Sequence, residues 1–338
     1  MPYSNKKEPP ELIDNFGRKL NYLRVSITDK CNLKCSYCVS HTPSPKLTHD
    51  EILRYEEILK IVEIGARHGI TKVRITGGEP LFRRGVYDFL NKLTAINGLT
   101  DVSLTTNGIL LKDNLKKIKD AGIRRLNISI DSLKKDKFKE ISGADMFETV
   151  WESIISAYEE GFNPIKLNVV AIPNVNTDEL ADFAKLTLKY PFHVRFIEYM
   201  PIGTPDLIVK KKLLTPEIKN IISQHGKIYK VDNGLNDGPA QLYRFEEGKG
   251  SIGFISPVSQ HFCNSCNRMR LTASGKLRSC LLSDKTTDIS GPLRRGCSDE
   301  ELYQIMLNAA AQKGEKHHLE LESSSADKVL DQMSSIGG

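Results

Sequence analysis

The sequence predicts an α/β fold: a partial, laterally open (β/α)6 barrel of the TIM type, followed by a C-terminal region that contains antiparallel strands. Three observations predict it. Short β-branched runs alternate with longer amphipathic stretches, polar and glycine residues follow the runs directly, and the pattern changes beyond about residue 226. A chain of 338 residues has room for such a fold.

Six β-branched runs are predicted strands and six amphipathic stretches are predicted helices. The strands are residues 23–27, 72–76, 101–105, 125–130, 166–171 and 194–198, and the helices are residues 48–68, 86–96, 110–121, 147–160, 177–190 and 215–224. Such a repeat closes into a parallel barrel in which the carboxyl ends of the strands face one mouth. With six repeats rather than eight, the barrel is expected to stay open on one side.

The last third of the chain lacks the alternation of strand and helix patterns that precedes it. Glycine, asparagine and proline turns separate short runs such as residues 241–245 and 251–255, which is typical of antiparallel strands. We therefore expect residues 1–225 to form the barrel and residues 226–338 to form a C-terminal region that covers its opening.

Composition narrows the class of protein. The apolar content of 39% is within the globular range, and the sequence has no apolar run of about eighteen residues, so no membrane span or secretory leader is expected. A cytoplasmic location follows as an expectation. The net charge of +6 is modest for this length, which favours an anionic small substrate over nucleic acid.

Two groups of three cysteines carry the strongest chemical signal. The first, Cys31, Cys35 and Cys38, has the spacing C-x3-C-x2-C and follows the first predicted strand. The second group is Cys263, Cys266 and Cys280. A structural zinc site takes four protein ligands, whereas a 4Fe-4S cluster held by three thiolates keeps one iron open. The sequence therefore predicts two such clusters, each with an open iron.

Other interpretations of the cysteines remain open. They could be buried apolar thiols. Zinc could bind with His41 as fourth ligand in the first group, or with His261 or Cys297 in the second. Disulfides are disfavoured because the cysteine count is seven and the chain is long enough to be stable without them. Cys297 is otherwise interpreted as a spare thiol.

The segment Gly77-Gly78-Glu79-Pro80 follows the second predicted strand. The two glycines allow a ligand to approach the backbone closely, and Glu79 supplies an acceptor for an ammonium group. An amino-acid-like ligand that chelates the open iron would use both features. A plain β-α turn is the alternative.

Cations recur on the predicted strands. Arg268 and Arg270 alternate after the second cysteine pair, and Lys72, Arg74, Lys166 and Arg195 lie on separate barrel strands. Inward-facing cations are costly unless they meet anions, so an anionic ligand inside the barrel would explain them; outward side chains paired under helices are the alternative. The terminal Gly337 and Gly338 are either a frayed end or a flexible tail that can enter a narrow channel.

The first cysteine loop, with Tyr37 between its last two cysteines, resembles that of the radical S-adenosylmethionine enzymes. A wider ordered set of motifs resembles the molybdenum cofactor biosynthesis protein A family within that superfamily. The set comprises residues 24–31, 74–81, 104–108, 127–131 and 195–200, the second cysteine trio with Arg268 and Arg270, and the Gly-Gly terminus.

The resemblance implies a 5'-GTP 3',8-cyclase that opens the molybdopterin pathway with two 4Fe-4S clusters. It assigns the first trio to the cluster that cleaves S-adenosylmethionine and the second trio to an auxiliary cluster that receives guanine. Contacts to S-adenosylmethionine are assigned to Tyr37, Gly77, Gly78, Glu79, Ser129 and Met200. Contacts to GTP are assigned to Arg24, Lys72, Arg74, Thr105, Lys166, Arg195, Arg268 and Arg270.

The implied reaction starts with a 5'-deoxyadenosyl radical that removes the ribose 3' hydrogen, after which the sugar radical attacks guanine C8. Arg24, Arg268 and Arg270 are the implied catalytic residues, which help to quench the resulting radical. The expected partners are a flavodoxin- or ferredoxin-like electron donor and a cyclic pyranopterin monophosphate synthase that receives the product. The chain is expected to be a monomer or a homodimer.

Two rivals remain at this point. A peptide-modifying radical enzyme with an auxiliary cluster shares the first motif but usually has more C-terminal cysteines. A zinc-stabilised nucleic-acid-binding protein would account for the cysteine groups and the positive charge.

Overall fold

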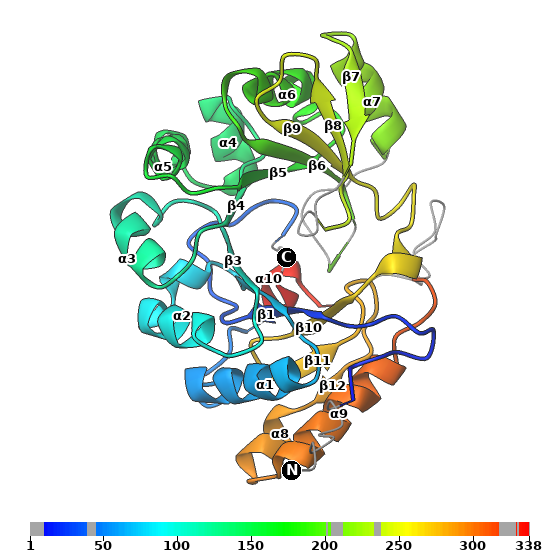
Figure 1. Cartoon of the computed structure of the whole chain (residues 1–338). Coiled ribbons are helices and arrows are strands. Elements are labelled where there is room, and N and C mark those ends of the chain that lie inside the picture. Colours follow the sequence, from blue (N-terminus) through cyan, green and yellow to red (C-terminus); the bar gives the residue numbers. More distant parts are fainter. Residues whose placement is uncertain are drawn as a thin grey trace, which may run out of the picture.

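A single mixed sheet organises the computed structural model. The structure describes residues 10–38, 45–200, 202–203, 212–232, 238–317, 329 and 331–337. In this part of the chain twelve strands form one sheet in the order β12-β11-β10-β1-β2-β3-β4-β5-β6-β9-β8-β7. Helices cover the outer, convex side of the curved sheet, and the C-terminus lies inside the curve (Figure 1).

The six barrel strands are β1 (Tyr22–Ser26), β2 (Lys72–Thr76), β3 (Asp101–Thr106), β4 (Leu126–Ser129), β5 (Ile165–Ala171) and β6 (His193–Glu198). The later strands are β7 (Ile228–Val231), β8 (Gln241–Phe245), β9 (Ser251–Ile255), β10 (Arg268–Leu271), β11 (Lys276–Arg278) and β12 (Thr287–Asp288). The helices are α1 (Tyr55–Arg67), α2 (Val86–Thr94), α3 (Leu115–Asp120), α4 (Lys135–Ser142), α5 (Phe147–Glu159), α6 (Leu180–Lys189), α7 (Thr215–Ser223), α8 (Ser290–Arg294), α9 (Asp299–Ala311) and α10 (Met333–Ile336). Short 3-10 turns occupy Pro80–Phe82, Lys112–Asn114, Thr177–Glu179 and Cys263–Ser265.

The predicted barrel and the antiparallel C-terminal strands are both confirmed. Strands β1 to β6 pair in parallel in chain order, and β7–β8, β8–β9, β10–β11 and β11–β12 pair antiparallel. The sequence did not predict that β9 joins β6 in parallel and β10 joins β1 in parallel. The C-terminal strands therefore extend the barrel at both of its edges, while the division at residue 225 stays a prediction.

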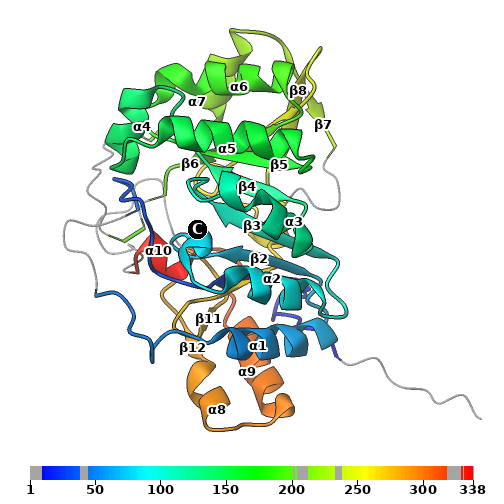
Figure 2. The same cartoon turned by 90° about the vertical axis from the view of Figure 1, so that its left-hand side faces the viewer.

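Side chains of each barrel strand alternate between the face that packs under the helices and the face that points into the barrel. On β1, Leu23 and Val25 are fully buried under the outer helices, and on β2 the same holds for Ile75. The intervening residues of each strand face the interior of the barrel, because successive side chains point to opposite faces. Figure 2 shows α1, α2, α3 and α5 lying over the strands on this outer side.

Several predicted helices have limits that differ from those expected; the stretch 177–190, for example, begins with a 3-10 turn and becomes α6 only at Leu180. The helix expected over residues 48–68 begins only at Tyr55, because the Leu53 amide donates to the Ala273 carbonyl (2.8 Å) and keeps this stretch attached to the C-terminal region. The stretch 110–121 divides into a 3-10 turn and the short α3. Helix α4 was not predicted, since five of its eight residues are charged and its apolar face is narrow.

In the described part of the chain, no helix is both long and apolar enough to cross a membrane.

Glu198, at the end of β6, joins three segments of the C-terminal half. Its carboxylate is 1% exposed and accepts hydrogen bonds from the amides of Thr215 (2.9 Å), Val258 (3.0 Å) and Ser259 (2.9 Å). It thereby holds the start of α7 and the loop after β9 against the barrel. No sequence pattern predicted this role of Glu198.

Replacement Glu198→Gln is expected to lower the free energy of unfolding by about 2 kcal/mol, because the side-chain amide has lost the charge and one of the two acceptor oxygens. The measurement is the thermal midpoint of the anaerobically purified protein. Glu63→Gln, on the exposed face of α1, is the matched control. Equal thermal midpoints for the two variants would contradict the stabilising role of the Glu198 hydrogen bonds.

Candidate active site

Both cysteine trios open onto one cavity of about 930 Å³ inside the barrel. Most of the predicted site residues line it: Arg24, Cys31, Cys35, Tyr37, Cys38, Arg74, Gly77, Gly78, Thr105, Ser129, Arg195, Met200, Cys263, Cys266, Arg268, Arg270 and Cys280. Lys72, Glu79 and Lys166 are not among the lining residues, and Gly338 lies outside the described residues. The structure thus brings residues separated by some 240 positions to one space.

The first cysteine loop begins where β1 ends and rests on the Gly77-Gly78 segment. The Gly78 amide donates to the Thr28 carbonyl (2.6 Å), and the Glu79 amide donates to the Lys30 carbonyl (2.9 Å). A Cβ on Gly78 would lie 2.3 Å from the Lys30 carbonyl oxygen, closer than any packed atom can be. Glycine is therefore required here because two backbones touch, in addition to any ligand that approaches.

Glu79 is directed into the protein. Its carboxylate is fully buried and accepts from the Leu81 amide (3.0 Å), the Thr106 hydroxyl (2.9 Å) and the Asn107 amide (2.7 Å). Burial raises its pKa to about 7, although these three hydrogen bonds oppose the shift. Glu79 thus braces the turns after β2 and β3; its predicted contact with an ammonium group stays a prediction.

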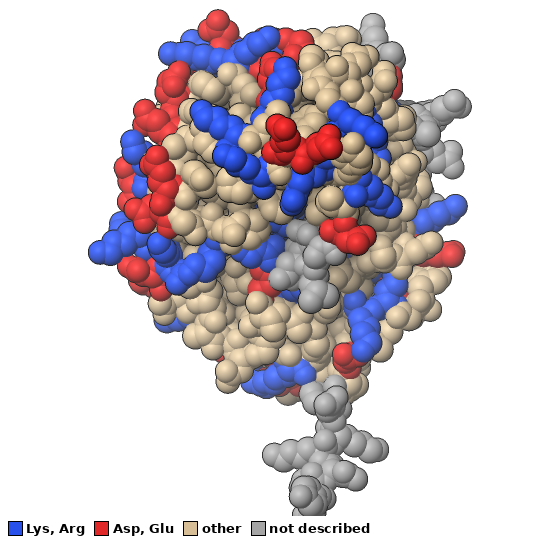
Figure 3. Space-filling model, turned by 45° about the horizontal axis from the view of Figure 1, so that its top comes forward, with Lys and Arg blue, Asp and Glu red and all other residues tan. Residues whose placement is uncertain are grey.

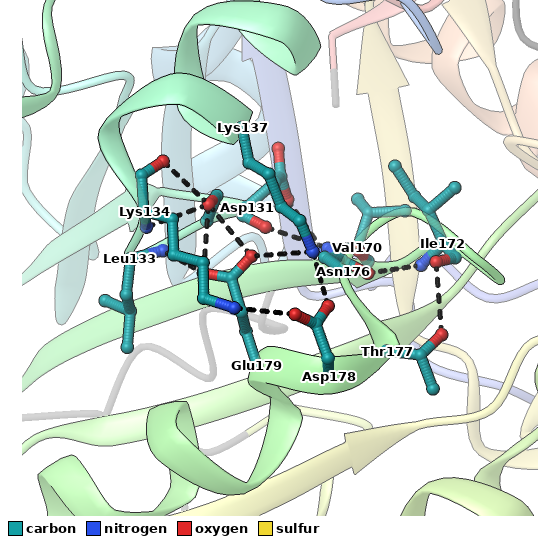
Figure 4. Close-up of polar contacts among 11 residues, drawn as sticks. Asp131, Leu133, Lys134, Lys137, Val170, Ile172, Asn176, Thr177, Asp178 and Glu179 are labelled. Atoms are coloured by element: carbon teal, nitrogen blue, oxygen red, sulfur yellow. Dashed lines mark hydrogen bonds and ion pairs between the residues drawn. The ribbon is translucent and has the colours of Figure 1, made fainter.

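Tyr37 is held by the segment that follows β4. Its hydroxyl donates to Asp131 Oδ2 (2.7 Å), and Asp131 Oδ1 accepts from the Val170 amide (2.8 Å). Figure 4 shows the support behind Asp131: the Asn176 side chain donates to the carbonyls of Asp131 and Val170, both at 2.8 Å. Burial raises the pKa of Asp131 to about 6.

Buried Glu179 fixes the same segment from the other side. It accepts from the Leu133 amide (2.7 Å) and lies 3.6 Å from Lys137 Nζ, while Lys134 pairs with Asp178 (2.7 Å) (Figure 4). Hydrogen bonds that link β4, β5 and α4 therefore fix the position of Tyr37, and with it the end of the cysteine loop.

Burial disfavours the thiolate form of the first trio as long as no metal is bound. Burial raises the pKa of all three thiols: that of Cys31 is raised, that of Cys35 is raised well above its usual range, and that of Cys38 is raised to about 12. Bound iron would replace these protons, which couples cluster loading to proton release. No three His, Cys, Asp or Glu side chains of the described residues converge on one point for a single ion; a cubane takes one thiolate per iron and needs no such point.

The second trio is held from behind by two basic side chains. Arg18 Nη1 donates to the Cys263 carbonyl (2.7 Å), and buried Lys313 donates to the Arg268 carbonyl (3.0 Å). Burial alone would raise the pKa of Cys266, but Arg268 and Lys313 outweigh it and lower that pKa to about 7. The local charge therefore favours the thiolate of Cys266, whereas burial raises the pKa of Cys263.

The structure locates two of the three residues that the sequence offered as fourth zinc ligands. His261 Nδ1 lies 2.9 Å from the Pro257 carbonyl and its ring packs edge-on against His317. Cys297 lies outside the central cavity, in a separate surface pocket, and His41 lies outside the described residues. All seven cysteines are free thiols.

Strand register places cationic residues of the cavity next to one another on neighbouring strands. Arg24 on β1 pairs with Arg74 on β2 and with Arg270 on β10. Burial, with repulsion from neighbouring arginines, lowers the pKa of Arg24 to about 10, that of Arg195 to about 9 and that of Arg270 well below its usual value. Asp131 is the only acid among the described lining residues.

The outer surface differs from the cavity. On the face shown in Figure 3, Lys and Arg side chains are interspersed with Asp and Glu. The cavity therefore concentrates positive charge that the visible surface does not, and this charge is compensated best by a polyanionic ligand.

The C-terminal segment enters the cavity from the side of the first trio. Ser334 donates its amide to the Cys38 sulfur, and the Gly337 carbonyl accepts from Arg270 Nη1. Gly337 has a φ of +76°, and a Cβ there would lie 2.8 Å from Thr76 Cγ2. The tail therefore packs against β1 and β2 in this structure.

Among the lining residues that escaped prediction are Tyr22, Asn168, Lys34 and Lys46. Tyr22 and Asn168 carried a usable signal, because each lies two positions from a predicted inward residue on its strand. The two lysines belong to loops and carried none.

Comparisons agree with this geometry. The Radical SAM superfamily model matches residues 25–187, and the Molybdenum Cofactor Synthesis C model matches residues 192–319. The solved structure of Streptococcus suis SuiB bound to S-adenosylmethionine shares the fold, with a TM-score of 0.60 at 14% identity over 84% of this chain and 65% of that chain. Fold and site define a radical S-adenosylmethionine enzyme, a class that implies a 4Fe-4S cluster and S-adenosylmethionine.

Closer relatives extend over nearly the whole chain. The GTP 3',8-cyclase of Moorella thermoacetica is 46% identical over 307 residues, which are 91% of this chain and 95% of the relative. That of Heliobacterium modesticaldum is 44% identical over 329 residues, 97% of this chain and 100% of the relative. This chain belongs to the GTP 3',8-cyclase family.

Replacement Gly78→Ala is expected to displace the first cysteine loop, because the new methyl group would overlap the Lys30 carbonyl. Iron per chain should fall from about eight atoms to about four, since only the first site is affected. Iron and sulfide analysis of anaerobically reconstituted protein measures this. Gly161→Ala is the control for general destabilisation, because its φ of +79° also strains an alanine but its Cβ meets nothing within 4 Å. A full iron content in Gly78→Ala would contradict the packing argument.

Replacement Gly337→Ala is expected to move the tail away from Thr76, because the residue has a positive φ and no space for a Cβ. Turnover should fall about tenfold or more while iron content stays unchanged. Steady-state rates and iron analysis on the same preparation separate the two effects. A variant with normal turnover would show that the tail is merely frayed.

Proposed function

We propose that this chain is a GTP 3',8-cyclase. It converts GTP to (8S)-3',8-cyclo-7,8-dihydroguanosine 5'-triphosphate with S-adenosylmethionine, the first step of molybdenum cofactor biosynthesis. The observation that carries the proposal is that two cysteine trios face one cavity whose charged lining is almost entirely cationic. Two open irons and a polyanion site in one space suit a nucleoside triphosphate held at both ends.

The residues of the first trio, Cys31, Cys35 and Cys38, would hold a 4Fe-4S cluster, and Cys263, Cys266 and Cys280 would hold a second. When bound, the first cluster supplies the electron that cleaves S-adenosylmethionine. The polypeptide itself contributes by positioning S-adenosylmethionine. Tyr37, Gly78, Ser129 and Met200 surround the first trio and would orient S-adenosylmethionine against it.

The cations of the barrel would hold the substrate between the two trios. Arg74 on β2 and Arg195 on β6 both line the cavity and would bind phosphate oxygens. Lys72 on β2 and Lys166 on β5 would join them. Arg24, Arg268 and Arg270 lie on the adjacent strands β1 and β10. Guanidinium groups there would orient the base and move a proton when the product radical is quenched.

Two further partners follow from this chemistry. A one-electron donor of the flavodoxin or ferredoxin type would reduce the first cluster, and a cyclic pyranopterin monophosphate synthase would consume the product. The location is proposed to be cytoplasmic, and the oligomeric state is proposed to be monomer or homodimer.

The test is anaerobic incubation of reconstituted protein with GTP, S-adenosylmethionine and a reductant. The expected products are 5'-deoxyadenosine and a cyclised nucleotide in equal amounts. Formation of 5'-deoxyadenosine without the cyclised nucleotide would reject GTP as substrate and favour the peptide-modifying rival. About two zinc ions per chain with no inorganic sulfide would reject the radical chemistry altogether.

Replacement Cys280→Ser is expected to separate the two half-reactions. It removes a ligand of the second trio only, so 5'-deoxyadenosine should still form while the cyclised product falls by more than about 100-fold. Product analysis by chromatography measures both. Cys297→Ser, which lies outside the cavity, should leave both products unchanged. Loss of 5'-deoxyadenosine in step with the cyclised product would contradict independent sites.

A further inference from the structure

Tyr22 occupies a position in the cavity to which no role has been assigned. It is the first residue of β1 and is paired in register with Arg268 on one side and Lys72 on the other. It is among the cavity-lining residues, two positions before Arg24 on the same face of the strand. Its side chain therefore shares the cavity with residues that would bind substrate.

The phenolic hydroxyl of Tyr22 is unpartnered within the part of the chain that the structure describes. Its oxygen is buried and has no hydrogen-bond partner among the described residues. More than nine in ten buried polar groups in folded proteins are satisfied, and one that is not destabilises the protein. An orphaned hydroxyl that faces a cavity therefore indicates a partner brought by a ligand.

The surroundings identify what that partner must be. The Arg74 guanidinium lies over the Tyr22 ring at 5.6 Å. Burial acts to raise the pKa of the phenol, but Arg74, together with Arg24, Arg268 and Arg195, outweighs burial and lowers it. A phenol next to cations that only donate must find an acceptor elsewhere. Asp131, the only carboxylate among the cavity-lining residues that the structure describes, already accepts from Tyr37 and Val170, so the acceptor belongs to the ligand.

We propose that Tyr22 is a further substrate-binding residue, whose hydroxyl donates a hydrogen bond to a phosphate oxygen of the bound nucleoside triphosphate. This inference rests on the proposed function. Phosphate oxygens combine the two properties that the position requires: they accept hydrogen bonds, and they carry the negative charge that the surrounding arginines demand. The base and ribose of the nucleotide offer acceptors but no charge.

The test compares Tyr22→Phe with the unmodified full-length protein, reconstituted with its clusters under anaerobic conditions. Phenylalanine keeps the ring and its packing on Arg74 and removes only the hydroxyl. Equilibrium binding is measured for GTP, inorganic triphosphate and guanosine. We expect about tenfold weaker binding of GTP and of inorganic triphosphate, with guanosine unchanged. Unchanged GTP affinity, or an equal loss for guanosine, would overturn the phosphate contact.

A second readout distinguishes a ligand contact from a structural role. Without nucleotide, Tyr22→Phe should have a thermal midpoint equal to or above that of the unmodified protein, because the removed hydroxyl had no partner. Saturating GTP should raise the midpoint of the variant less than that of the unmodified protein. A lower midpoint of the nucleotide-free variant would mean that the hydroxyl is satisfied within the protein, which overturns the inference.

Tyr303→Phe is the matched control. The Tyr303 hydroxyl is partly buried but donates to the Pro10 carbonyl (3.0 Å), far from the cavity. This variant should lose stability and keep its affinity for GTP. If the unmodified protein does not bind GTP, the proposed function fails and this inference fails with it. If the unmodified protein and Tyr22→Phe bind GTP equally well, the inference fails and the proposed function stands.

Discussion

The parallel pairing of β1 with β10 is the constraint on which the site depends. The first trio follows the carboxyl end of β1, and Cys263 and Cys266 precede the amino end of β10. Because the two strands run in parallel and in register, the trios lie at opposite ends of the same strand pair. Five residues at about 3.3 Å each separate the ends by roughly 16 Å. A ligand of the length of a nucleotide can therefore reach from one trio toward the other.

The same register determines the electrostatics between the trios. Period-two alternation places Arg24, Arg74 and Arg270 in one layer, on three neighbouring strands. Their mutual repulsion and burial are visible in the lowered pKa values of Arg24 and Arg270. Positive charge gathered in a buried space is energetically unfavourable until an anion arrives, so the residues proposed to bind substrate reduce the stability of the protein without it.

Local sequence was sufficient for much of this arrangement. All six barrel strands lie within two residues of their predicted limits, because strand alternation and capping are encoded over a few residues. The parallel docking of β9 on β6 and of β10 on β1 was not predictable, since a short apolar run does not specify its partner. Glu198 and Lys313 escaped for the same reason: their partners are distant in sequence, and a single Glu or Lys carries no pattern.

The tail shows how a second strand pair extends the site. Arg270 on β10 and Arg278 on β11 are register partners; Arg270 donates to the Gly337 carbonyl, and fully buried Arg278 pairs with Asp331. Two arginines from one antiparallel pair thus hold both ends of the C-terminal segment. Because Arg270 also lines the cavity, Gly337 and a bound ligand draw on the same guanidinium, and the position of the tail is coupled directly to the state of the site.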